Sequence, residues 1–396
     1  MSSRVKSINI LGITGSVGGA AMDVIVSQPE RFDVHAVTAH RNAEELAQRA
    51  RAIKARRAVI ADATLYARLK DLLSGSGIEA SAGPDALDEA ASQPVDCTLA
   101  AIMGMAGLRP LMAAIKHSSC VAIANKEPLV AAGAQVMAAA RAHGTHLLPV
   151  DSEHNAIFQV FDHARPEGIE KIILTASGGP FRTWGRAEMA LATPAQALAH
   201  PNWVMGQKIS IDSATMMNKA LEVIEAHVLF GMPPERIKVL LHPESIIHSM
   251  VEYKDGSVLA QMGASDMRTP VAHALAWPER MHTPGQRLDF SSLKSLTFEQ
   301  PDDDRFPALR QAYGALAAGP WACVALNAAN EIAVEAFLQS RIGFLGITEA
   351  ICHIMDETGP ESLNTLEDVM AFDQTVRRAA QNYIINYSTQ STAVNS

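Results

Sequence analysis

Gly12-Ile13-Thr14-Gly15-Ser16-Val17-Gly18-Gly19 is the stretch that decides the fold class of this chain. It follows the apolar run Ser7–Ile13, and a segment with helical character comes after it. Glycines at this position let backbone amides approach a pyrophosphate, and the N-terminus of the helix adds partial positive charge. A tight strand-to-helix turn would use the same glycines, and the GxxGxxG spacing differs from the usual GxGxxG. The location between a first strand and a helix favours a dinucleotide-binding loop.

The residues around this loop alternate short apolar runs with helical patterns. Helical patterns such as Ala43–Ile53 and Leu129–Ala142 separate the runs, and Asn42 with Glu45 resembles a capping box. The expected strands are Ser7–Ile13, Phe32–Ala39, Ala58–Ala61, Cys97–Ile102, Cys120–Ala124 and His146–Val150. Such alternation predicts an α/β fold, with a Rossmann-like, mostly parallel sheet covered on both faces. Residues 1–150 are therefore expected to form a dinucleotide-binding domain.

The pattern changes after Val150. Lys171–Thr175 is typical of a strand, and Ser213–Phe230 predicts one amphipathic helix. Asp255-Gly256 between the apolar runs Ser245–Tyr253 and Ser257–Met262 predicts a β-hairpin. Residues 151–280 are therefore expected to form an α/β catalytic domain with antiparallel strands. Within it, residues 181–208 carry two tryptophans and little periodicity, which indicates a surface flap.

The last part of the chain has a helical pattern. Residues 281–311 are rich in proline and acidic side chains and are expected to be a linker. Helices are expected over Ala322–Gln339, Thr348–Glu357 and Leu366–Tyr383. Residues 312–396 are thus expected to be a C-terminal helical domain, whose last nine or so residues form a disordered polar tail.

Composition limits the class of protein. The chain has 396 residues, which predicts two or three domains, and 42 acidic against 33 basic side chains. The acidic excess argues against a nucleic-acid or anionic-membrane partner. We find no signal peptide and no run near the roughly 18 uninterrupted apolar residues of a membrane span. Four scattered cysteines are expected to be reduced core residues, which fits a cytoplasmic protein.

The end of the second expected strand indicates which dinucleotide is bound. The residues there are Ala39-His40-Arg41-Asn42, with no acid before Glu44. An acid at this place would bind the ribose 2′-hydroxyl of NAD, whereas Arg41 is suited to a 2′-phosphate. The sequence therefore favours NADPH. The alternative is that Arg41 is only a solvated charge at the start of a helix.

Two acids, Asp151 and Glu153, come directly after the expected strand His146–Val150. Ligands bind at the carboxyl ends of strands in open α/β sheets, and hard cations such as Mg²⁺ and Mn²⁺ prefer oxygen ligands. Glu222, on the face of a helix that also carries Asn218, is the candidate third ligand. Asp151 as a helix cap and Glu222 as part of a surface salt bridge are the alternatives. Glu225, one turn further on, is either a neighbour of the site or simply solvated.

Side chains suited to a phosphate are found near these acids in the sequence. They are Ser177 in a glycine turn, Ser213 at the expected start of a helix, Asn218 and Lys219. Hydroxyls, an amide and an ammonium group at a helix N-terminus make a plausible phosphomonoester site. Each of them singly has an ordinary structural role, so the combination carries the prediction.

The chain resembles the 1-deoxy-D-xylulose 5-phosphate reductoisomerase family over essentially its whole length. The resemblance rests on long motifs rather than on the glycine loop alone. They are residues 12–18, Ala124-Asn125-Lys126-Glu127, residues 149–159, Ser177-Gly178-Gly179-Pro180-Phe181, His200-Pro201-Asn202-Trp203, residues 212–219 with Glu222, and His242-Pro243-Glu244-Ser245. Two positions depart from the family pattern: His40 stands where glycine is usual, and Pro128 where serine is common.

The resemblance implies roles for individual residues. Those expected to bind NADPH are Thr14, Gly15, Ser16, Val17, Arg41, Asn42, Asn125, Glu127 and Gly206, with Met267 against the nicotinamide. Those expected to bind a divalent metal, Mg²⁺ or Mn²⁺ with Co²⁺ as a further candidate, are Asp151, Glu153 and Glu222. Those expected to contact the sugar phosphate are Lys126, Ser152, Glu153, Ser177, His200, Trp203, Ser213, Asn218, Lys219 and Glu222. The three metal ligands and Lys126 are the expected catalytic residues.

The resemblance also implies an activity. A homodimer is expected to rearrange 1-deoxy-D-xylulose 5-phosphate with the help of the metal, then to reduce the product with NADPH to 2-C-methyl-D-erythritol 4-phosphate, in isoprenoid precursor biosynthesis. Two alternatives remain at this point. One is a plain NADPH-dependent dehydrogenase of a phosphorylated hydroxy acid, and the other is a non-catalytic dinucleotide sensor.

Overall fold

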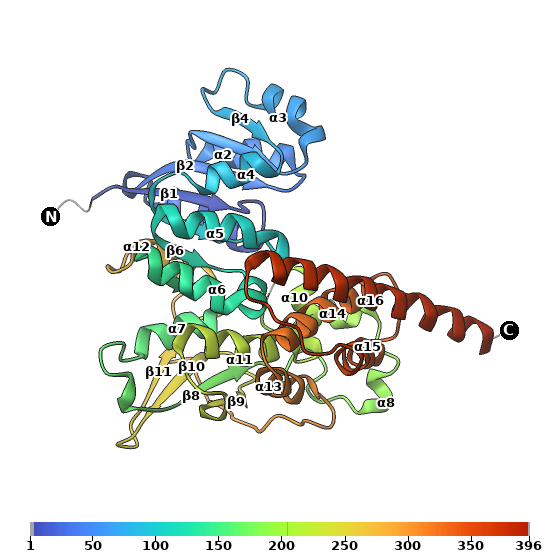
Figure 1. The fold of residues 1–396 in the computed structure, drawn as a ribbon. Helices are drawn as coiled ribbons and strands as arrows, with labels where there is room; N and C mark the ends of the chain where they lie inside the picture. Colours follow the sequence, from blue (N-terminus) through green and yellow to red (C-terminus); the bar gives the residue numbers. More distant parts are fainter. Residues whose placement is uncertain (1–3, 204, 395–396) are drawn as a thin grey trace. The chain divides into compact units, whose positions relative to one another are not determined.

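The computed structural model describes residues 4–203 and 205–394 (Figure 1). The chain divides into two compact units. One contains Met1–Pro128, Val136–Gln159 and Asp266–Leu288, and the other contains Leu129–Gln135, Val160–Ser265 and Asp289–Ser396. The predicted boundaries at residues 150, 280 and 311 remain predictions.

A parallel sheet forms the centre of the first unit. Within residues 4–203 it has seven strands in the order β4-β3-β2-β1-β5-β6-β7, and every neighbouring pair is parallel. The strands are β1 (Lys6–Leu11), β2 (Phe32–Ala39), β3 (Arg57–Ile60), β4 (Glu79–Ala82), β5 (Val95–Ala100), β6 (Ser118–Ile123) and β7 (His146–Pro149). The predicted Rossmann-like sheet is confirmed. Only β4 was missed, because its sequence Glu-Ala-Ser-Ala has no apolar run.

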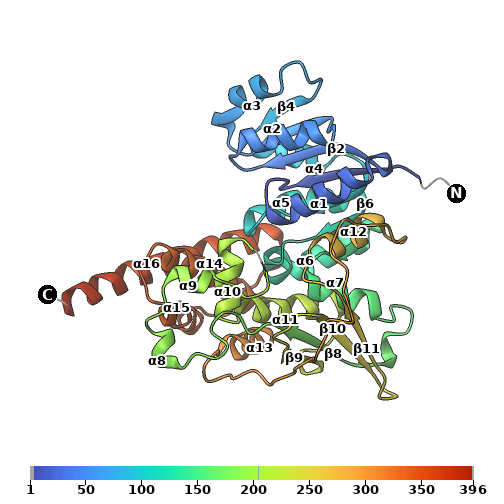
Figure 2. The same cartoon turned by 180° about the vertical axis from the view of Figure 1, so that it is seen from behind.

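Helices cover both faces of this sheet. They are α1 (Ser16–Ser27), α2 (Ala43–Ala52), α3 (Tyr66–Leu72), α4 (Pro84–Ala91), α5 (Leu108–His117), α6 (Glu127–His143), α7 (Ser152–Val160) and α12 (Arg268–Ala276). The main buried core joins residues of α1, α2 and α12 to strand residues such as Ile8 and Ile10. A smaller cluster packs α4 against β2 and β3. Figure 1 shows the sheet from the side of α4 and α5, and Figure 2 shows it from the side of α1 and α12.

The second unit contains a mixed sheet. In the described part of the chain it has four strands, β8 (Ile169–Ala176), β9 (Ile237–Leu241), β10 (Ile247–Tyr253) and β11 (Val258–Met262), in the order β11-β10-β8-β9. The predicted hairpin is confirmed as the antiparallel pair β10–β11. β9 was missed. It pairs with β8 in parallel.

The helices of the second unit differ from the prediction in several places. They are α8 (Arg186–Met189), α9 (Pro194–Leu198), α10 (Gln207–Ala214), α11 (Met217–Phe230), α13 (Ala308–Ala318), α14 (Pro320–Leu338), α15 (Phe344–Glu357) and α16 (Leu366–Val394). The single helix predicted over Ser213–Phe230 is wrong, because Met216 adopts a left-handed conformation with φ of 63° and separates α10 from α11. The tail predicted to be disordered continues α16 as far as Val394, and residues 395–396 lie outside the described residues.

α14 is the central helix of the C-terminal part. It packs against α13, α15 and α16, and also against α10. By length and composition alone it could cross a membrane, with a mean hydropathy of 1.2 in its most apolar window, but 78% of that window is buried inside the protein. Burial of this extent is that of a core helix. The cysteine prediction needs one correction: Cys97, Cys120 and Cys323 are free and buried, whereas Cys352 is free and exposed.

Candidate active site

The glycine loop links β1 to α1 as predicted. The α-helix begins at Ser16 with Gly15 as its cap residue, and the Gly12 amide donates to the Thr38 hydroxyl at 2.9 Å. Gly18 lies so close to the strand end that a Cβ there would stand 2.5 Å from the Gly12 carbonyl oxygen and would overlap the Ile13 carbonyl. Only glycine therefore allows α1 to start this near β1. Thr14, Gly15, Ser16 and Val17 form the turn and the first residues of the helix.

The strand order places this loop where ligands bind in open α/β sheets. β1 lies between β2 and β5, so the chain reverses its direction of growth across the sheet at β1. Asn125, just after β6, donates to the Ile102 and Gly104 carbonyl oxygens at 2.5 and 2.9 Å. These bonds hold the loop that follows β5. Asn125 and Pro128 also line a small cavity at these strand ends together with Ile102 and Gly107.

Arg41 and Asn42 stand at the end of β2, as expected. Arg41 Nε lies 3.1 Å from Asp62 Oδ2, and its side chain is 69% exposed. The guanidinium therefore faces solvent with one carboxylate neighbour, which the sequence reading had not foreseen because Asp62 follows β3. The Asn42 side chain caps α2 by accepting from the Glu45 amide at 3.1 Å, and its Nδ2 donates to Glu45 Oε2 at 2.7 Å, so Asn42 is the cap residue as predicted.

A buried ion pair stands at the carboxyl ends of β6 and β7. Lys126 Nζ lies 2.6 Å from Asp151 Oδ2, and the two side chains are only 7% and 11% exposed. Burial alone would raise the pKa of Asp151, but the Lys126 charge and His154 together hold it well below its ordinary value. This low pKa keeps the Asp151 carboxylate ionised at neutral pH. Glu127, the first residue of α6, is buried beside Lys126 in the sequence.

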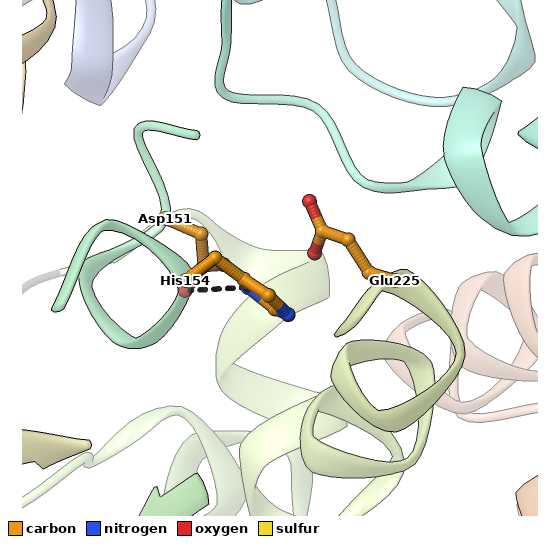
Figure 3. Close-up of side chains that lie close together, drawn as sticks. All are labelled: Asp151, His154 and Glu225. Atoms are coloured by element: carbon orange, nitrogen blue, oxygen red, sulfur yellow. Dashed lines mark ion pairs between the residues drawn. The ribbon is translucent and has the colours of Figure 1, made fainter. Parts of the chain in front are cut away.

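Two groups of side chains have the composition of a metal site. Asp151 and Glu153 of the first unit, with Glu222 of the second, are one set of candidate metal ligands. Asp151 and His154 with Glu225, which Figure 3 draws, are the other set. Three carboxylate oxygens fit a hard cation such as Mg²⁺, whereas a set with an imidazole nitrogen suits softer divalent ions. The first group is the predicted triad.

His154 and Glu225 were not assigned by sequence reasoning. His154 Nδ1 lies 3.9 Å from Asp151 Oδ1, and both His154 and Glu225 are buried. The alternative that Glu225 is simply solvated is therefore wrong. Their spacing in the sequence could have indicated them. His154 lies three positions after Asp151, and Glu225 lies three positions after Glu222, so each is a neighbour of a predicted ligand one helical turn away.

Glu222 is buried at 0% exposure near the start of α11. It accepts hydrogen bonds from Asn218 Nδ2 on Oε1 and from Lys219 Nζ on Oε2, both at 2.5 Å. Lys219 is 3% exposed. The alternative of a surface salt bridge is therefore wrong: this is a buried pair whose charges require each other. Asn218 and Lys219 lie in the first turn of α11, as a phosphate site requires.

Ser177 and His200 form a hydrogen-bonded pair. His200 Nδ1 accepts from the Asn202 and Trp203 backbone amides at 3.2 and 3.0 Å. An acceptor nitrogen carries no proton, so the proton is on Nε2, which donates to Ser177 Oγ at 2.9 Å. Ser177 Oγ also accepts from the Gly179 amide at 3.2 Å. The Ser177 hydroxyl is therefore left to donate its own proton, which suits an anion.

Ser213 lies beside the glycine turn but not where it was predicted. The expectation that Ser213 begins a helix is wrong, because it is in the last turn of α10. Gly179, with φ of 66°, packs on it so closely that a Cβ would lie 2.5 Å from the Ser213 carbonyl oxygen. The turn after β8 and the junction of α10 with α11 are thus in direct contact, and Ser213 packs against the turn that begins at Ser177.

The remaining predicted residues have varied surroundings. Ser152 donates to the Glu153 carboxylate. The Trp203 ring lies tilted by 53° against the His248 ring, with centroids 6.1 Å apart. The neighbouring Asn202 side chain donates to the Pro243 carbonyl oxygen and to the Ser245 hydroxyl at 2.7 and 2.9 Å. Gly206 is the cap residue of α10, and Met267 that of α12. Residues 181–206 contain the short helices α8 and α9.

These features define the class of protein. A parallel sheet with a glycine loop at its switch point is a dinucleotide-binding fold, and a triad of carboxylates with a phosphate-type helix start is a metal-assisted site for a phosphorylated substrate. The class is a dinucleotide-dependent enzyme with a candidate metal site.

Comparison with known proteins gives the family. Residues 8–133 match the model of 1-deoxy-D-xylulose 5-phosphate reductoisomerase, and residues 147–230 and 262–379 match two models of its C-terminal domain. The chain is 54% identical to the 1-deoxy-D-xylulose 5-phosphate reductoisomerase of Zymomonas mobilis over 95% of this chain and 97% of that protein. It is 55% identical to that of Rhodospirillum centenum over 96% and 94% of the respective chains.

Solved structures agree with these matches. The Zymomonas mobilis reductoisomerase in complex with NADPH superposes with a TM-score of 0.91 at 52% identity, covering 96% of this chain and 99% of that one. A DOX-P reductoisomerase in complex with NADPH, fosmidomycin and magnesium superposes with a TM-score of 0.90 at 41% identity, covering 96% and 98%. The chain belongs to the 1-deoxy-D-xylulose 5-phosphate reductoisomerase family. The predicted family, fold class, enzyme class and reaction are confirmed.

Proposed function

We propose that this protein converts 1-deoxy-D-xylulose 5-phosphate into 2-C-methyl-D-erythritol 4-phosphate, with NADPH as hydride donor and with Asp151, Glu153 and Glu222 as ligands of a divalent metal. The observation that carries this proposal is the set of three carboxylates that are candidate ligands of one metal ion, Asp151 and Glu153 after β7 and Glu222 on α11. Relatives with bound NADPH and magnesium support the choice of cofactors. When bound, Mg²⁺ or Mn²⁺ supplies Lewis acidity to the ketone and the neighbouring hydroxyl of the substrate.

Lys126 and Ser152 act at the reacting end of the substrate. Lys126 Nζ, held 2.6 Å from Asp151, places a positive charge where the substrate oxygens become negative during C–C cleavage. Because the ion pair is buried, this charge is weakly screened. Ser152 adds a hydroxyl at the start of α7.

Four groups bind the phosphate at the other end of the substrate. Ser177 and Ser213 offer hydroxyls, and Asn218 and Lys219 offer donors at the start of α11, whose helix dipole favours an anion. His200 orients Ser177 through the tautomer fixed by its backbone contacts. This binding energy, remote from the bond that breaks, holds the substrate in its reactive position. Trp203 and the flap 181–208 exclude water from the intermediate when they close over it.

The cofactor contacts follow from the first unit. The amides of Thr14 to Val17 bind the pyrophosphate, and Arg41 with Asn42 binds the 2′-phosphate. Asn125, Glu127, Gly206 and Met267 surround the nicotinamide end. Arg41 keeps its guanidinium largely exposed, so one face is available to a phosphate beside Asp62.

We further propose a cytoplasmic homodimer. β11 is an edge strand of its sheet, and Val258 and Leu259 on it are 47% and 49% exposed. An edge strand with apolar side chains is a surface for pairing with a second copy. Reduced cysteines fit the cytoplasm.

One assay tests the proposed function. NADPH absorbance is followed with 1-deoxy-D-xylulose 5-phosphate in the presence of Mg²⁺ and after its removal by a chelator. We expect oxidation that requires both the sugar phosphate and the metal, and a product with a branched methyl carbon. Oxidation that gives an unbranched product would leave only a plain dehydrogenase.

A further inference from the structure

α14 carries two buried asparagines one turn apart, Asn327 and Asn330. Both are 0% exposed, and the side-chain oxygen of each has no hydrogen-bond partner. A buried amide that is only partly satisfied costs free energy, so an apolar residue would make a more stable helix core. Neither residue belongs to the site described above. The NH₂ group of each, however, donates to a carboxylate.

Asn330 holds the carboxylate of Asp212 on α10. Its Nδ2 donates to Asp212 Oδ1 at 2.9 Å, and the other carboxylate oxygen lies 2.9 Å from Lys208 Nζ. Asp212 is 1% exposed, so these contacts are made in a dry environment. Lys208 lies in the first turn of α10 and Asp212 in its last turn. Asn330 therefore fixes the last turn of this short helix to α14, and the Lys208–Asp212 ion pair within α10 links its first turn to that anchored carboxylate.

The position of α10 gives this contact a consequence for the substrate. Ser213 directly follows Asp212, and its carbonyl oxygen is the atom against which Gly179 packs. The start of α10, at Gly206 and Gln207, is also the point where the segment 181–206 rejoins the helical core. A rotation or shift of α10 would therefore move Ser213 away from Ser177 and would displace the end of the flap.

We propose that Asn330 is a positioning residue for the sugar-phosphate site. It does not touch the substrate, but it anchors Asp212 and thereby the adjacent Ser213. The inference rests on the proposed role of Ser213 in phosphate binding. It predicts that loss of this anchor lowers affinity for the sugar phosphate more than affinity for NADPH, because Asn330 holds the last turn of α10, whereas Gly206, assigned to the cofactor, caps its first turn.

Asn327 is a matched control on the same helix. Its Nδ2 donates to Glu331 Oε1 at 3.0 Å, and Glu331 Oε2 accepts from Arg377 on α16 at 2.8 Å. Asn327 thus has the same residue type, burial and unsatisfied oxygen as Asn330, but it serves the contact with α16. Loss of either amide damages the packing of α14 equally, whereas only loss of Asn330 releases α10.

The experiment compares Asn330→Leu with Asn327→Leu in the full-length enzyme. Loss of a hydrogen bond to a buried charge predicts that Asn330→Leu raises KM for the sugar phosphate about tenfold, with KM for NADPH changed less than about twofold. Hydrogen exchange, read without substrate, should speed up for the backbone amides of residues 207–213 and not for those of β8. Asn327→Leu should leave both quantities as in the wild type.

A second variant keeps the inference testable if Asn330→Leu does not fold. The substitution Asn330→Ala removes the same hydrogen bond to Asp212 without inserting a bulky apolar side chain. We expect it to speed up exchange over residues 207–213 as Asn330→Leu does. Unchanged KM and unchanged exchange in whichever of these two variants folds, or equal effects in Asn327→Leu, would overturn the inference. Failure of the wild type to oxidise NADPH with this sugar phosphate would refute the proposed function instead, because the exchange measurement needs no activity.

Discussion

Replacing Glu222 with glutamine separates the metal-binding role of this residue from its role in folding. Glu222→Gln keeps the shape of the side chain and removes its charge. In the native protein the carboxylate accepts from Asn218 and Lys219 at 2.5 Å each. Glutamine has one acceptor oxygen, so one of these two bonds is lost and an NH₂ group faces a donor. Lys219, 3% exposed, also loses this counter-charge.

The magnitude follows from these contacts. Breaking a buried ion pair by removing one partner costs about 3–5 kcal/mol of stability, which remains within the usual total of about 5–15 kcal/mol. We therefore expect a folded variant whose melting temperature without metal falls by about 10 °C. Loss of one of three anionic oxygens should reduce turnover at saturating NADPH by about a hundredfold or more. NADPH affinity should stay within about twofold, since the residue is not assigned to the cofactor.

The assay measures NADPH oxidation against Mg²⁺ concentration, together with NADPH binding by fluorescence. Glu225→Gln is the informative comparison, because Glu225 belongs to the second group of side chains around Asp151, with His154. If the oxygen triad holds the metal, Glu222→Gln shifts the Mg²⁺ dependence to higher concentration far more than Glu225→Gln. The opposite order would assign the metal to the group that includes His154. Wild-type turnover in Glu222→Gln would refute the triad.

Three further predictions concern the first unit. Gly18→Ala introduces a Cβ 2.5 Å from the Gly12 carbonyl oxygen. We therefore expect a loss of about 1–3 kcal/mol in unfolding free energy and weaker NADPH binding in a fluorescence titration. Gly168→Ala is the control, because no atom lies within 4 Å of the new Cβ there. Arg41→Gln should raise KM for NADPH about tenfold and leave KM for NADH unchanged, because one charge-assisted contact to the 2′-phosphate is lost; equal effects on both cofactors would contradict this. Burial, with a smaller effect of the Arg280 charge, lowers the pKa of His273 from 6.5 to about 4. Between these two pH values the unfolded chain binds more protons than the folded protein. Stability therefore falls as the pH decreases from 6.5 towards 4. Urea unfolding at several pH values should show a loss of about 1–2 kcal/mol in unfolding free energy, a figure lowered because the His273 side chain is partly exposed. His273→Gln should remove this loss. An identical pH dependence of stability in the variant would show that His273 is not its cause.

The environment of His273 explains the direction of that shift. Asn155 Nδ2, which also donates to the Pro149 carbonyl oxygen at 2.9 Å, lies 3.0 Å from His273 Nδ1. A nitrogen that accepts from an amide is unprotonated, so the contact favours the neutral ring. The contact joins α7 to α12, two segments 118 residues apart in the chain.

Much of the fold could be predicted because it depends on neighbours in the sequence. β2 spans Phe32–Ala39 as expected, since an apolar run between turn residues is a local signal. The β10–β11 hairpin follows from Asp255-Gly256, and the start of α2 from Asn42 with Glu45. The triad was also within reach, because acids placed after a strand and on one helix face are visible in the sequence.

Other features were decided only when distant segments packed together. Ser213–Phe230 has the periodicity of one helix, but the left-handed Met216 divides it, and the Ser213 carbonyl meets Gly179 at the break. The burial of Glu225 and the contact of Asn330 with Asp212, 118 residues away, have no local signal. Periodicity and turn chemistry record the preferences of a few successive residues, whereas these contacts depend on which surfaces meet after the chain has folded. Local sequence signals were sufficient for the strands other than β4 and β9, for the glycine loop and for the candidate ligands, whereas tertiary packing decided which buried polar groups satisfy one another.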